Sequence, residues 1–417
     1  MTQIETNFPS IIDAEIAPHT DAKNNQGIDG QATLVGEKSD EIDLDISEQR
    51  LYAAIDLGTN KCRLLIVRQS IDHSANAAIN LSENIFAQTW RKENGQNNLG
   101  ESTFPQNHLE VVESFSSTVW LGDGLSEDNF LHEYAMERAL TALRICADKL
   151  SLYRPYALRA VATAACRNAK NADDFRERIA NETGLEIEII SAEQEAMLAL
   201  HGCSSLIDQK EPFALMFDIG GGSTEILWLE RKNDTLSLPP QITTPDHLDR
   251  RGFMSLPLGV SNLMNYCRNN GFAPDTRQTM KCFNQMRDSV IDILQDFEQD
   301  HQICDHIEQY GVQMLGCSST VTTIIAKHLD LKRYDRARVD GQFITRSAIK
   351  SEITQILQEI SESQSYSTLF SRHKRRDFVL SGCAIISAII DIWPVERLRV
   401  ADRGVREGIL LGLMGQS

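Results

Sequence analysis

Two turns of the form Asp-x-Gly contain residues suited to phosphate chemistry. The first turn comprises Asp56, Gly58, Thr59 and Asn60, and the second comprises Asp218, Gly220, Gly221, Gly222, Ser223, Thr224 and Glu225. Glycine lets a backbone approach an anion closely, and the successive N–H groups of such a turn can point at one phosphate. The hydroxyl groups of Thr59, Ser223 and Thr224 would add further donors. The pattern therefore indicates a phosphate site built from two turns.

Carboxylates at these turns point to a further component of the site. Asp56 and Asp218 begin the two turns, and a carboxylate would repel a phosphate directly. A Mg²⁺ ion or a polarised water between the two groups would remove that conflict. The alternative of two ordinary β-hairpins with glycine turns stays open on residue types alone. The ten histidines and nine cysteines show no ligand spacing, so we expect no transition-metal site.

Glu195 and Arg167 have side chains that could act in a phosphate site, but their positions in the sequence also fit ordinary structural roles. Ser191 and Gln194 fit a capping box, so a helix should begin there with Glu195 in its first turn. A carboxylate in that place commonly interacts with the helix dipole, which contributes about 0.3–1 kcal/mol. Arg167 follows a short predicted strand, where an arginine is usually a solvated surface group. Position alone therefore assigns neither residue to a site.

Short apolar strands must position both turns. Residues 51–67 and 213–229 each contain an apolar run, the turn and a second apolar run, as in a strand–turn–strand unit. The two aspartates are 218 − 56 = 162 residues apart, a domain-sized spacing that suggests an internal duplication with a site between the halves. Predicted strands and helices alternate between the two units, which indicates an α/β fold.

The rest of the pattern predicts helices and loops. Residues 126–150 have helical periodicity, and Asn171 can cap a helix that stops at Gly184. A loop is expected over 232–251, and the chain from Phe378 to its end is expected to be helical. The apolar stretch that starts at Phe378 is interrupted by polar residues and by proline, so we expect a buried helix there and no membrane span.

Charge and composition exclude some classes of function. The 417 residues carry 41 basic and 59 acidic side chains, a formal net charge of −18. That charge argues against a general nucleic-acid binder and against binding to anionic membranes. Residues 1–47 form an acidic, aromatic-poor tail expected to be disordered, and residues 69–107 are expected to be an inserted loop. We expect a cytoplasmic protein, since neither a signal peptide nor a disulfide framework is evident.

The sequence resembles the exopolyphosphatase / guanosine pentaphosphate phosphohydrolase family in its short form. The resemblance covers roughly residues 51–417 and rests on AIDLGTN (54–60), AVATAACRNAKNADDF (160–175), IEIISAEQEA (187–196), FDIGGGSTE (217–225), SLPLGVSNL (255–263), GCSSTVTTIIAKHL (316–329), RYDRARVDG (333–341) and LRVADRGVREGILLGLM (398–414). It implies an actin-like, duplicated ribonuclease-H-type fold with a catalytic cleft between two α/β domains. The implied domains are residues 48–190 and 191–403, with a C-terminal helix over 404–417 that packs back toward the first domain.

The resemblance also implies roles for individual residues. It implies Mg²⁺-dependent hydrolysis of a terminal phosphoanhydride, with Glu195 as the general base and Arg167 as a phosphate-binding arginine. Both turns would be phosphate loops, and Asp218 and Glu225 would handle the metal or the attacking water. The chain departs from the family pattern at Gln194, Met197 and Ser319, which bears on substrate affinity and preference.

Several functions stay open at this point. We expect an exopolyphosphatase that acts on polyphosphate, with guanosine pentaphosphate as the alternative substrate. An actin-like ATPase or kinase, or a non-catalytic sensor of guanosine tetraphosphate or polyphosphate, would also fit the motifs. Relatives of this type are commonly dimers, so a homodimer is expected. The basic groups at 332–338, 372–376 and 397–406 are expected to line a positive channel for a polyanion.

Overall fold

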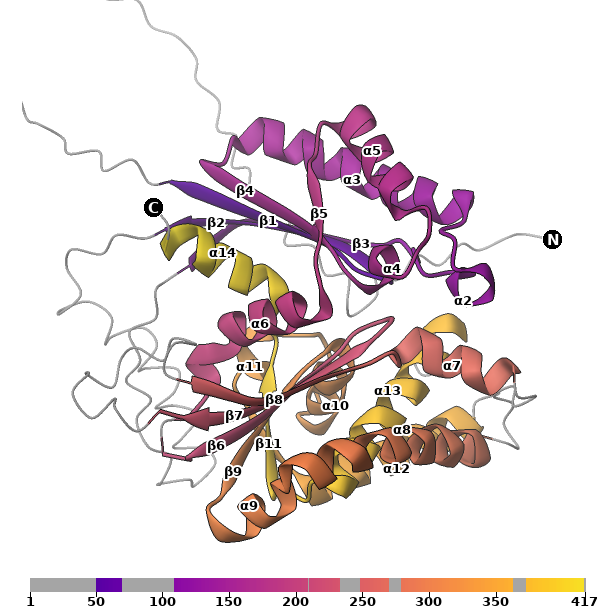
Figure 1. Ribbon diagram of the computed structural model, residues 1–417, viewed down its shortest axis with the longest axis vertical. Helices are drawn as coiled ribbons and strands as arrows, with labels where there is room; N and C mark the ends of the chain where they lie inside the picture. Colours follow the sequence, from indigo (N-terminus) through magenta and orange to yellow (C-terminus); the bar gives the residue numbers. More distant parts are fainter. Residues whose placement is uncertain are drawn as a thin grey trace, which may run out of the picture.

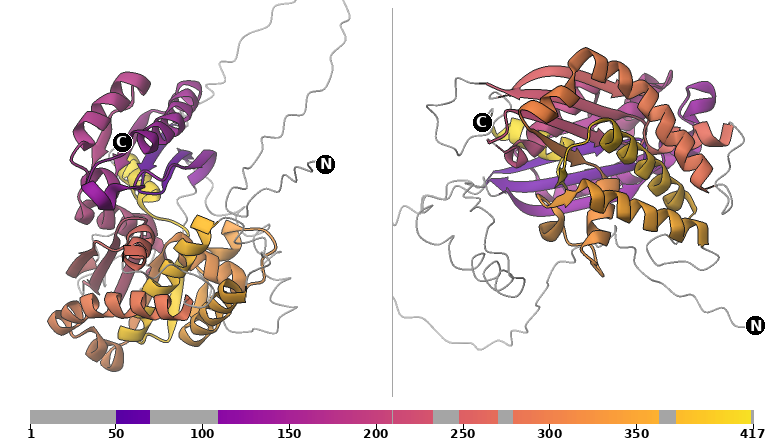
Figure 2. Two further views of the ribbon diagram at one scale, coloured as in Figure 1. Left: turned by 90° about the vertical axis from the view of Figure 1, so that its right-hand side faces the viewer. Right: turned by 90° about the horizontal axis from the view of Figure 1, so that it is seen from below.

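The computed structural model describes residues 50–69, 109–208, 210–232, 248–269, 279–362 and 373–415. These residues form two α/β domains stacked one above the other, each around its own mixed sheet (Figure 1). The predicted acidic tail over 1–47 and nearly all of the predicted insertion over 69–107 lie outside the described residues. Two further views show the sheets and their covering helices (Figure 2).

The first domain has a five-stranded sheet in the order β3-β2-β1-β4-β5. Its strands are β1 (Leu51–Leu57), β2 (Lys61–Gln69), β3 (Leu109–Thr118), β4 (Ala157–Ala162) and β5 (Ile187–Ile189). The pairs β1–β2 and β2–β3 are antiparallel, whereas β4 and β5 continue the sheet in parallel from β1.

The second domain repeats this order in a six-stranded sheet, β8-β7-β6-β9-β11-β10. Its strands are β6 (Phe213–Ile219), β7 (Thr224–Arg231), β8 (Leu248–Leu256), β9 (Val312–Cys317), β10 (Phe343–Thr345) and β11 (Arg397–Ala401). The pairs β6–β7 and β7–β8 are antiparallel, and β9 and β11 continue in parallel from β6. Strand β10 pairs with β11 in antiparallel orientation and forms the edge of the sheet.

The helices lie on both faces of each sheet (Figure 1). They are α2 (Leu125–Asp128), α3 (Glu133–Tyr153), α4 (Ala164–Arg167), α5 (Ala172–Thr183), α6 (Ala192–Cys203), α7 (Val260–Asn269), α8 (Thr279–His301), α9 (Ile303–Gln309), α10 (Ser319–His328), α11 (Arg336–Val339), α12 (Arg346–Glu362), α13 (His373–Ile392) and α14 (Val405–Gly415). A short 3₁₀ turn covers Ser204–Leu206. None of the helices within the described ranges has the length and apolar character needed to cross a membrane.

The two halves repeat each other residue by residue at their first strand. β1 and β6 are each seven residues long and have the same alternation of buried and half-buried positions. Gly58 N donates to Lys61 O at 2.8 Å, and Gly220 N donates to Ser223 O at 2.9 Å, so both turns close with the same hydrogen bond. The predicted duplicated α/β fold is therefore confirmed, and the 162-residue spacing is the offset between its halves.

Helices α6 and α14 lie together between the two sheets (Figure 1). They share one apolar cluster with residues from both sheets, among them Ala54 of β1 and Met216 of β6. The two helices touch at glycine, since a Cβ on Gly408 would lie 1.9 Å from the Leu198 carbonyl oxygen. Such an approach leaves no space for a side chain, and it fixes α6 firmly against α14.

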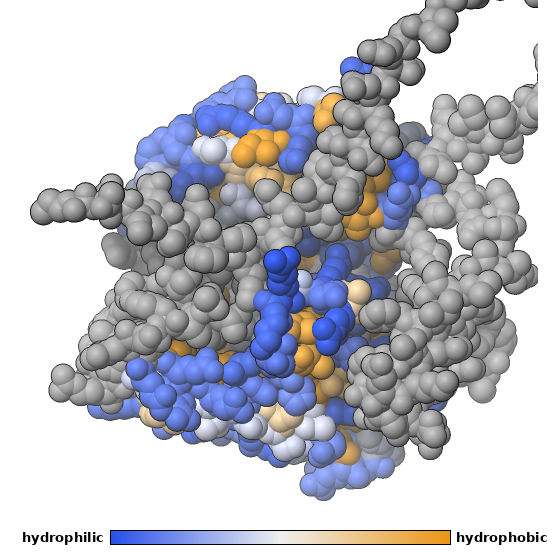
Figure 3. Space-filling view, turned by 180° about the vertical axis from the view of Figure 1, so that it is seen from behind, coloured by the Kyte–Doolittle hydropathy of each residue, from blue (hydrophilic) through white to orange (hydrophobic). Residues whose placement is uncertain are grey.

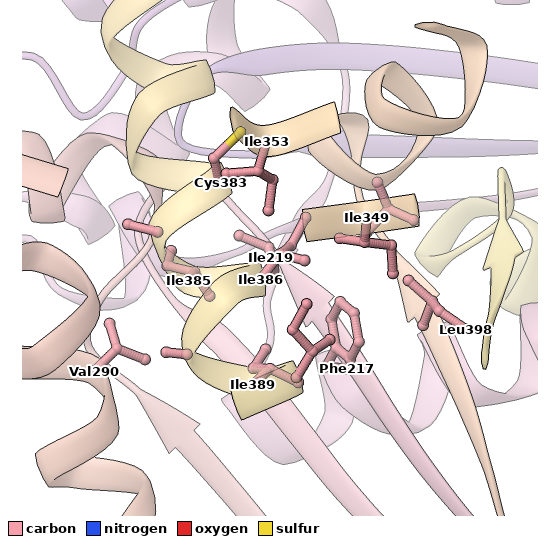
Figure 4. Packing of buried hydrophobic residues seen from close by; sticks show 14 of the residues in the cluster. Phe217, Ile219, Val290, Ile349, Ile353, Cys383, Ile385, Ile386, Ile389 and Leu398 are labelled. Carbon is pink, nitrogen blue, oxygen red and sulfur yellow. The ribbon is translucent and has the colours of Figure 1, made fainter. Parts of the chain in front are cut away.

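The outer face of the second sheet carries the largest apolar cluster, centred on α13 (Figure 4). Phe217 and Ile219 of β6 face Ile386 and Ile389 of α13, and all four are nearly inaccessible to solvent. The expected buried helix after Phe378 is confirmed. Seen from behind, the described surface is mainly hydrophilic with separate apolar areas (Figure 3).

Four expectations about local structure are wrong. The loop expected over 232–251 does not extend to its predicted end, because β8 begins at Leu248. The chain after Phe378 is not helical throughout, because β11 runs between α13 and α14. The single helix expected from Ser126 is divided into α2 and α3, because Asn129 takes a left-handed conformation (φ 63°) that ends α2, and α3 begins at Glu133. Asn171 precedes α5 without capping it, because its side-chain oxygen accepts from Leu131 N at 2.8 Å.

Candidate active site

The carboxylates of the two turns occupy equivalent positions in the two sheets. Asp56 lies opposite Arg63 in the β1–β2 register, and their side chains are 3.7 Å apart. Asp218 lies opposite Glu225 in the β6–β7 register. Arg63 and Glu225 also differ by 162 residues, so they occupy equivalent positions on β2 and β7. That position carries a guanidinium group in the first half and a second carboxylate in the second half. The two acidic groups of the second half therefore face each other.

The first loop, residues 58–60, turns its carbonyl groups toward the end of β3. Thr59 O accepts from Gly122 N at 3.1 Å, and Asn60 O accepts from the N–H groups of Val119 and Trp120 at 2.9 and 3.2 Å. The C=O of one residue and the N–H of the next point in opposite directions across a trans peptide. The N–H of Asn60 therefore points away from β3, and it has no acceptor among the described residues.

The second loop, residues 220–223, is held in the same manner by the start of α7. Gly220 O and Gly221 O accept from the N–H groups of Val260 and Ser261 at 3.1 and 2.9 Å. Gly222 O accepts from the side-chain amide of Asn262 at 2.5 Å. Across a trans peptide, the N–H of the next residue points opposite to the carbonyl, so the N–H groups of Gly221, Gly222 and Ser223 point away from α7. Those N–H groups have no acceptor within the part of the chain that the structure describes.

The two loops touch across the domain junction. A Cβ on Gly221 would lie 2.7 Å from Asn60 Nδ2, and one on Gly222 would lie 2.8 Å from Thr59 Oγ1. Glycine is required at both positions because any side chain would collide with the first loop. Ser261 Oγ also donates to Asn60 Oδ1 at 2.9 Å, which is a direct hydrogen bond between the domains.

Glu195 and Arg167 form a partly buried ion pair beside these loops. The capping box of Ser191 and Gln194 is present, so α6 begins at the position that the sequence predicts. Arg167, the last residue of α4, donates to Glu195 Oε2 and to Ile190 O, both at 3.0 Å. Glu195 is only 9% exposed, unlike a carboxylate that merely decorates a helix end on the surface.

Four carboxylates crowd this junction, and their pKa values are raised. Burial, and then the negative charge of Glu225, raise the pKa of Glu195 from its ordinary 4.5 to about 8, although Arg167 acts in the opposite direction. Burial followed by the charge of Glu195 raises the pKa of Asp218 to about 7, and burial raises that of Glu225 to about 7. Burial also raises the pKa of Asp56, which Arg63 partly offsets. The cluster therefore favours extra protons or a cation.

The acidic pair Asp218 and Glu225 fits a hard divalent cation. Within the described ranges, no three His, Cys, Asp or Glu side chains form a preformed cage for a metal ion. Mg²⁺ does not require such a cage, because it usually takes one or two carboxylates and completes its coordination with water and substrate phosphates. Two buried carboxylates that repel each other provide suitable oxygen ligands for such a cation, while the neighbouring backbone N–H groups could bind the oxygens of a phosphate.

Some expected donors have other partners. The hydroxyl of Thr224 donates to Leu258 O at 2.7 Å, so it holds β7 to the next segment and does not face a phosphate. The hydroxyl of Ser223 hydrogen-bonds to Glu225. The N–H groups of Gly58 and Gly220 close their own turns. The donors that remain available to a phosphate are therefore the backbone N–H of Asn60 in the first loop and those of Gly221, Gly222 and Ser223 in the second.

The structure adds residues that the sequence pattern did not single out. Arg63 faces Asp56, and Ser255 donates to Glu225 Oε1 at 3.0 Å. Ser261 and Asn262 hold the second loop. The 162-residue offset could have identified Arg63, because it pairs this position with Glu225. Ser261 and Asn262 lie in the segment SLPLGVSNL (255–263) that carries the resemblance, but that segment does not reveal their partners, which are backbone carbonyls and a distant amide.

Three of the basic side chains that were expected to line a channel have acceptors within the protein, and the channel itself stays a prediction. Arg336 donates to Asp402 O at 2.7 Å and to Glu407 Oε1 at 2.8 Å. Arg399 donates to Leu206 O, and Arg403 donates to Asp340. These guanidinium groups fasten the junction between β11 and α14. The side chains at 372–376 lie outside the described residues.

Comparisons with known proteins agree with this architecture. A family model described as the Ppx/GppA phosphatase family matches residues 103–417. The bifunctional 3-dehydroquinate synthase/phosphatase of Fusobacterium nucleatum is 26% identical over 395 residues, which cover 92% of this chain and 50% of that protein. The chain thus spans about half the length of that curated relative.

Two solved structures show the same fold. One is a Ppx/GppA family member from Aquifex aeolicus, with a TM-score of 0.62, 23% identity and coverage of 88% of this chain and 98% of that chain. The other is described as an exopolyphosphatase from Cytophaga hutchinsonii, with a TM-score of 0.65, 19% identity and the same coverage of both chains. At these identities the likeness establishes the fold.

Proposed function

The chain belongs to the Ppx/GppA phosphatase family, and from this premise we propose that it releases terminal orthophosphate from inorganic polyphosphate by Mg²⁺-dependent hydrolysis. Water attacks the terminal phosphorus, the phosphoanhydride bond breaks, and the shortened chain leaves with the bridging oxygen. The arrangement of carboxylates, arginine and glycine loops at the domain junction supports this reaction class.

Glu195 is proposed as the general base that orients the attacking water and accepts its proton. Its burial and the neighbouring Glu225 raise its pKa to about 8, which gives a carboxylate enough basicity for proton transfer near neutral pH. The ion pair with Arg167 at 3.0 Å holds the carboxylate in one place. The partly buried Glu195–Arg167 pair, adjacent to loops whose N–H groups have no acceptor among the described residues, is the observation that carries the proposal.

The two loops and Arg167 are proposed to stabilise charge on the transferring phosphoryl group. Fixed donors that require no rearrangement during the reaction are the main source of such stabilisation. Gly221 and Gly222 bring the second loop into contact with the first, so both loops can donate to one phosphate. The phosphate would replace solvent at the N–H groups described above.

Asp218 and Glu225 are the proposed Mg²⁺ ligands. When bound, the cation supplies positive charge that offsets the two carboxylates and the phosphate oxygens. Ser255 and Ser223 hydrogen-bond to Glu225 and keep that carboxylate in place. The protein's own part is to bury both carboxylates close together, which raises their pKa values to about 7 and favours a bound cation in place of protons.

A parallel assay tests the proposal and separates the alternatives. Purified protein with Mg²⁺ is assayed for phosphate release from long polyphosphate, tripolyphosphate and guanosine pentaphosphate. Release from the inorganic chains without any nucleotide supports an exopolyphosphatase and excludes a kinase. Preference for guanosine pentaphosphate would replace the proposed substrate, and binding without turnover of any of the three would indicate a sensor.

A further inference from the structure

The second loop owes its orientation to the first turn of α7. Backbone N–H groups of Val260 and Ser261 hold the first two loop carbonyls, whereas the third, Gly222 O, is held by the side chain of Asn262. The same amide of Asn262 also reaches Pro257 O at 3.2 Å, which closes the segment between β8 and α7. Of the three contacts, the one from Asn262 is the contact that a substitution can remove without altering the backbone.

Ser261 acts on the first loop. Its hydroxyl donates to Asn60 Oδ1, so the oxygen of that amide has a donor, whereas its NH₂ group has no acceptor among the described residues. Asn60 Nδ2 lies beside Gly221, where a Cβ would be 2.7 Å away. One helix turn in the second domain therefore orients donors in both loops.

We propose that Ser261 and Asn262 are positioning residues for phosphate binding and transfer. Asn262 holds the Gly222 peptide so that the following N–H points away from α7, and Ser261 orients the Asn60 amide so that its NH₂ group is available to the same anion. The inference deepens the proposed function and rests on it, since it assumes that the anion at the loops is a phosphate group.

The helix itself does not require these side chains. Alanine has a higher helix propensity than serine or asparagine, so a purely structural role within α7 would be preserved or improved by Ser261→Ala. The asparagine amide donates to Gly222 O and Pro257 O. Asn262→Asp keeps the shape and replaces the donor group by an oxygen that repels both carbonyls.

The test combines kinetics, binding and stability for the full chain. Tripolyphosphate hydrolysis gives kcat and KM, calorimetry gives the affinity for inorganic phosphate and orthovanadate, and thermal unfolding gives Tm. For Asn262→Asp we expect kcat/KM to fall by about 10²-fold, as for loss of a fixed transition-state donor. Phosphate and vanadate affinity should fall by about tenfold or more, a loss comparable to one hydrogen bond to a charged group.

Ser261→Ala should lose about 3- to 10-fold in kcat/KM, and Ser261→Thr, which retains the hydroxyl, should recover most of it.

Asn171→Asp is the matched control. Asn171 bonds the backbone of Leu131 with both ends of its amide, at 2.8 and 3.0 Å, in the first domain. Its substitution should lower Tm while leaving phosphate affinity unchanged. If Asn262→Asp behaves in that manner, the positioning role is wrong.

The binding measurement separates this inference from the proposed function. If the wild-type protein binds phosphate but does not hydrolyse tripolyphosphate, the proposed function fails, and weaker phosphate binding by Asn262→Asp still supports positioning. Equal phosphate binding by wild type and Asn262→Asp overturns the inference even in an active enzyme. Absence of phosphate and vanadate binding by the wild type overturns it outright.

Discussion

The guanidinium of Arg167 lies 3.0 Å from the carboxylate of Glu195, and this ion pair joins the end of α4 to the first turn of α6. The two side chains are 21% and 12% exposed, so water screens their interaction only in part. Burial and the charge of Glu225 raise the pKa of Glu195, and Arg167 offsets only part of that rise by favouring the charged carboxylate. The protonation state of Glu195 thus depends on both domains.

Removal of Arg167 should shift the pH dependence of the reaction. Because Arg167 lowers the pKa of Glu195, Arg167→Met should raise that pKa further and move the acid limb of kcat/KM to more alkaline pH. Activity at pH 7 should fall by about tenfold or more, because less Glu195 is deprotonated and the phosphate-binding guanidinium of Arg167 is absent. The profile of phosphate release is measured between pH 6 and 10.

Arg159→Met is the control for that shift. Arg159 has a 3.0 Å ion pair with Glu188, but the pair is exposed and remote from the loops. Exposed pairs contribute little, so its pH profile should match that of the wild type. An unshifted profile for Arg167→Met would separate Arg167 from Glu195 in function.

The stability of the metal-free protein should fall as pH rises from about 5 to 8. Glu195, Asp218 and Glu225 have folded-state pKa values raised to about 8, 7 and 7, so the folded protein binds more protons than the unfolded chain in this window. Deprotonation then favours the unfolded state. Thermal unfolding scans in chelator check the trend.

Two comparisons assign this slope to the carboxylate cluster. Glu195→Gln should reduce the fall in Tm between pH 5 and 8, because one titrating group is gone. Mg²⁺ should raise Tm more at pH 8 than at pH 5, since it binds the deprotonated pair. A Tm that stays level or rises with pH in both proteins would contradict the raised pKa values.

The α6–α14 contact should be sensitive to a single methyl group. Gly408→Ala places a Cβ 1.9 Å from Leu198 O, and we expect the free energy of unfolding to fall by about 1–3 kcal/mol. Gly412→Ala, on the same helix with no atom within 4 Å of the new Cβ, should be more stable by about 0.5–1 kcal/mol. Urea denaturation measures both, and equal stability would disprove the close packing.

Local signals predicted the elements around the turns well. The apolar runs before Asp56 and Asp218 became β1 and β6, and the capping box at Ser191 became the start of α6. In these places the physical cause is local, since an apolar run must be buried and a capped turn begins a helix. The duplication followed from the same local pattern at a constant offset.

Elements without a local signal were missed. β8 begins at Leu248 inside an expected loop, because its polar residues Asp249, Arg250 and Arg251 are tolerated on an edge strand. β11 was assigned to a helix, although its pairing with β9 decides its state. Such pairing depends on residues far apart in sequence, as propensity alone does not fix a strand.

In the candidate site, as in the fold, the features that depend on contacts between distant residues could not be predicted from local sequence. Position alone left Glu195 as a helix-end carboxylate, and its burial against Arg167 emerges only from the packing of α4 against α6. The role of Asn262 depends on a backbone carbonyl forty residues away. Asn262 lies in the segment SLPLGVSNL (255–263) that carries the resemblance, but residue types do not show which backbone group a side chain contacts, so its role comes from the structure.

The measurement that tests the account most directly is phosphate release by Glu195→Gln. The substitution keeps the size of the side chain and removes the base, and Glu193→Gln, on the exposed side of the same helix turn, is its matched control. We expect Glu195→Gln to lose at least about 10²-fold in kcat with an intact fold, while Glu193→Gln stays close to the wild type. A near-normal rate for Glu195→Gln would contradict its role as the general base.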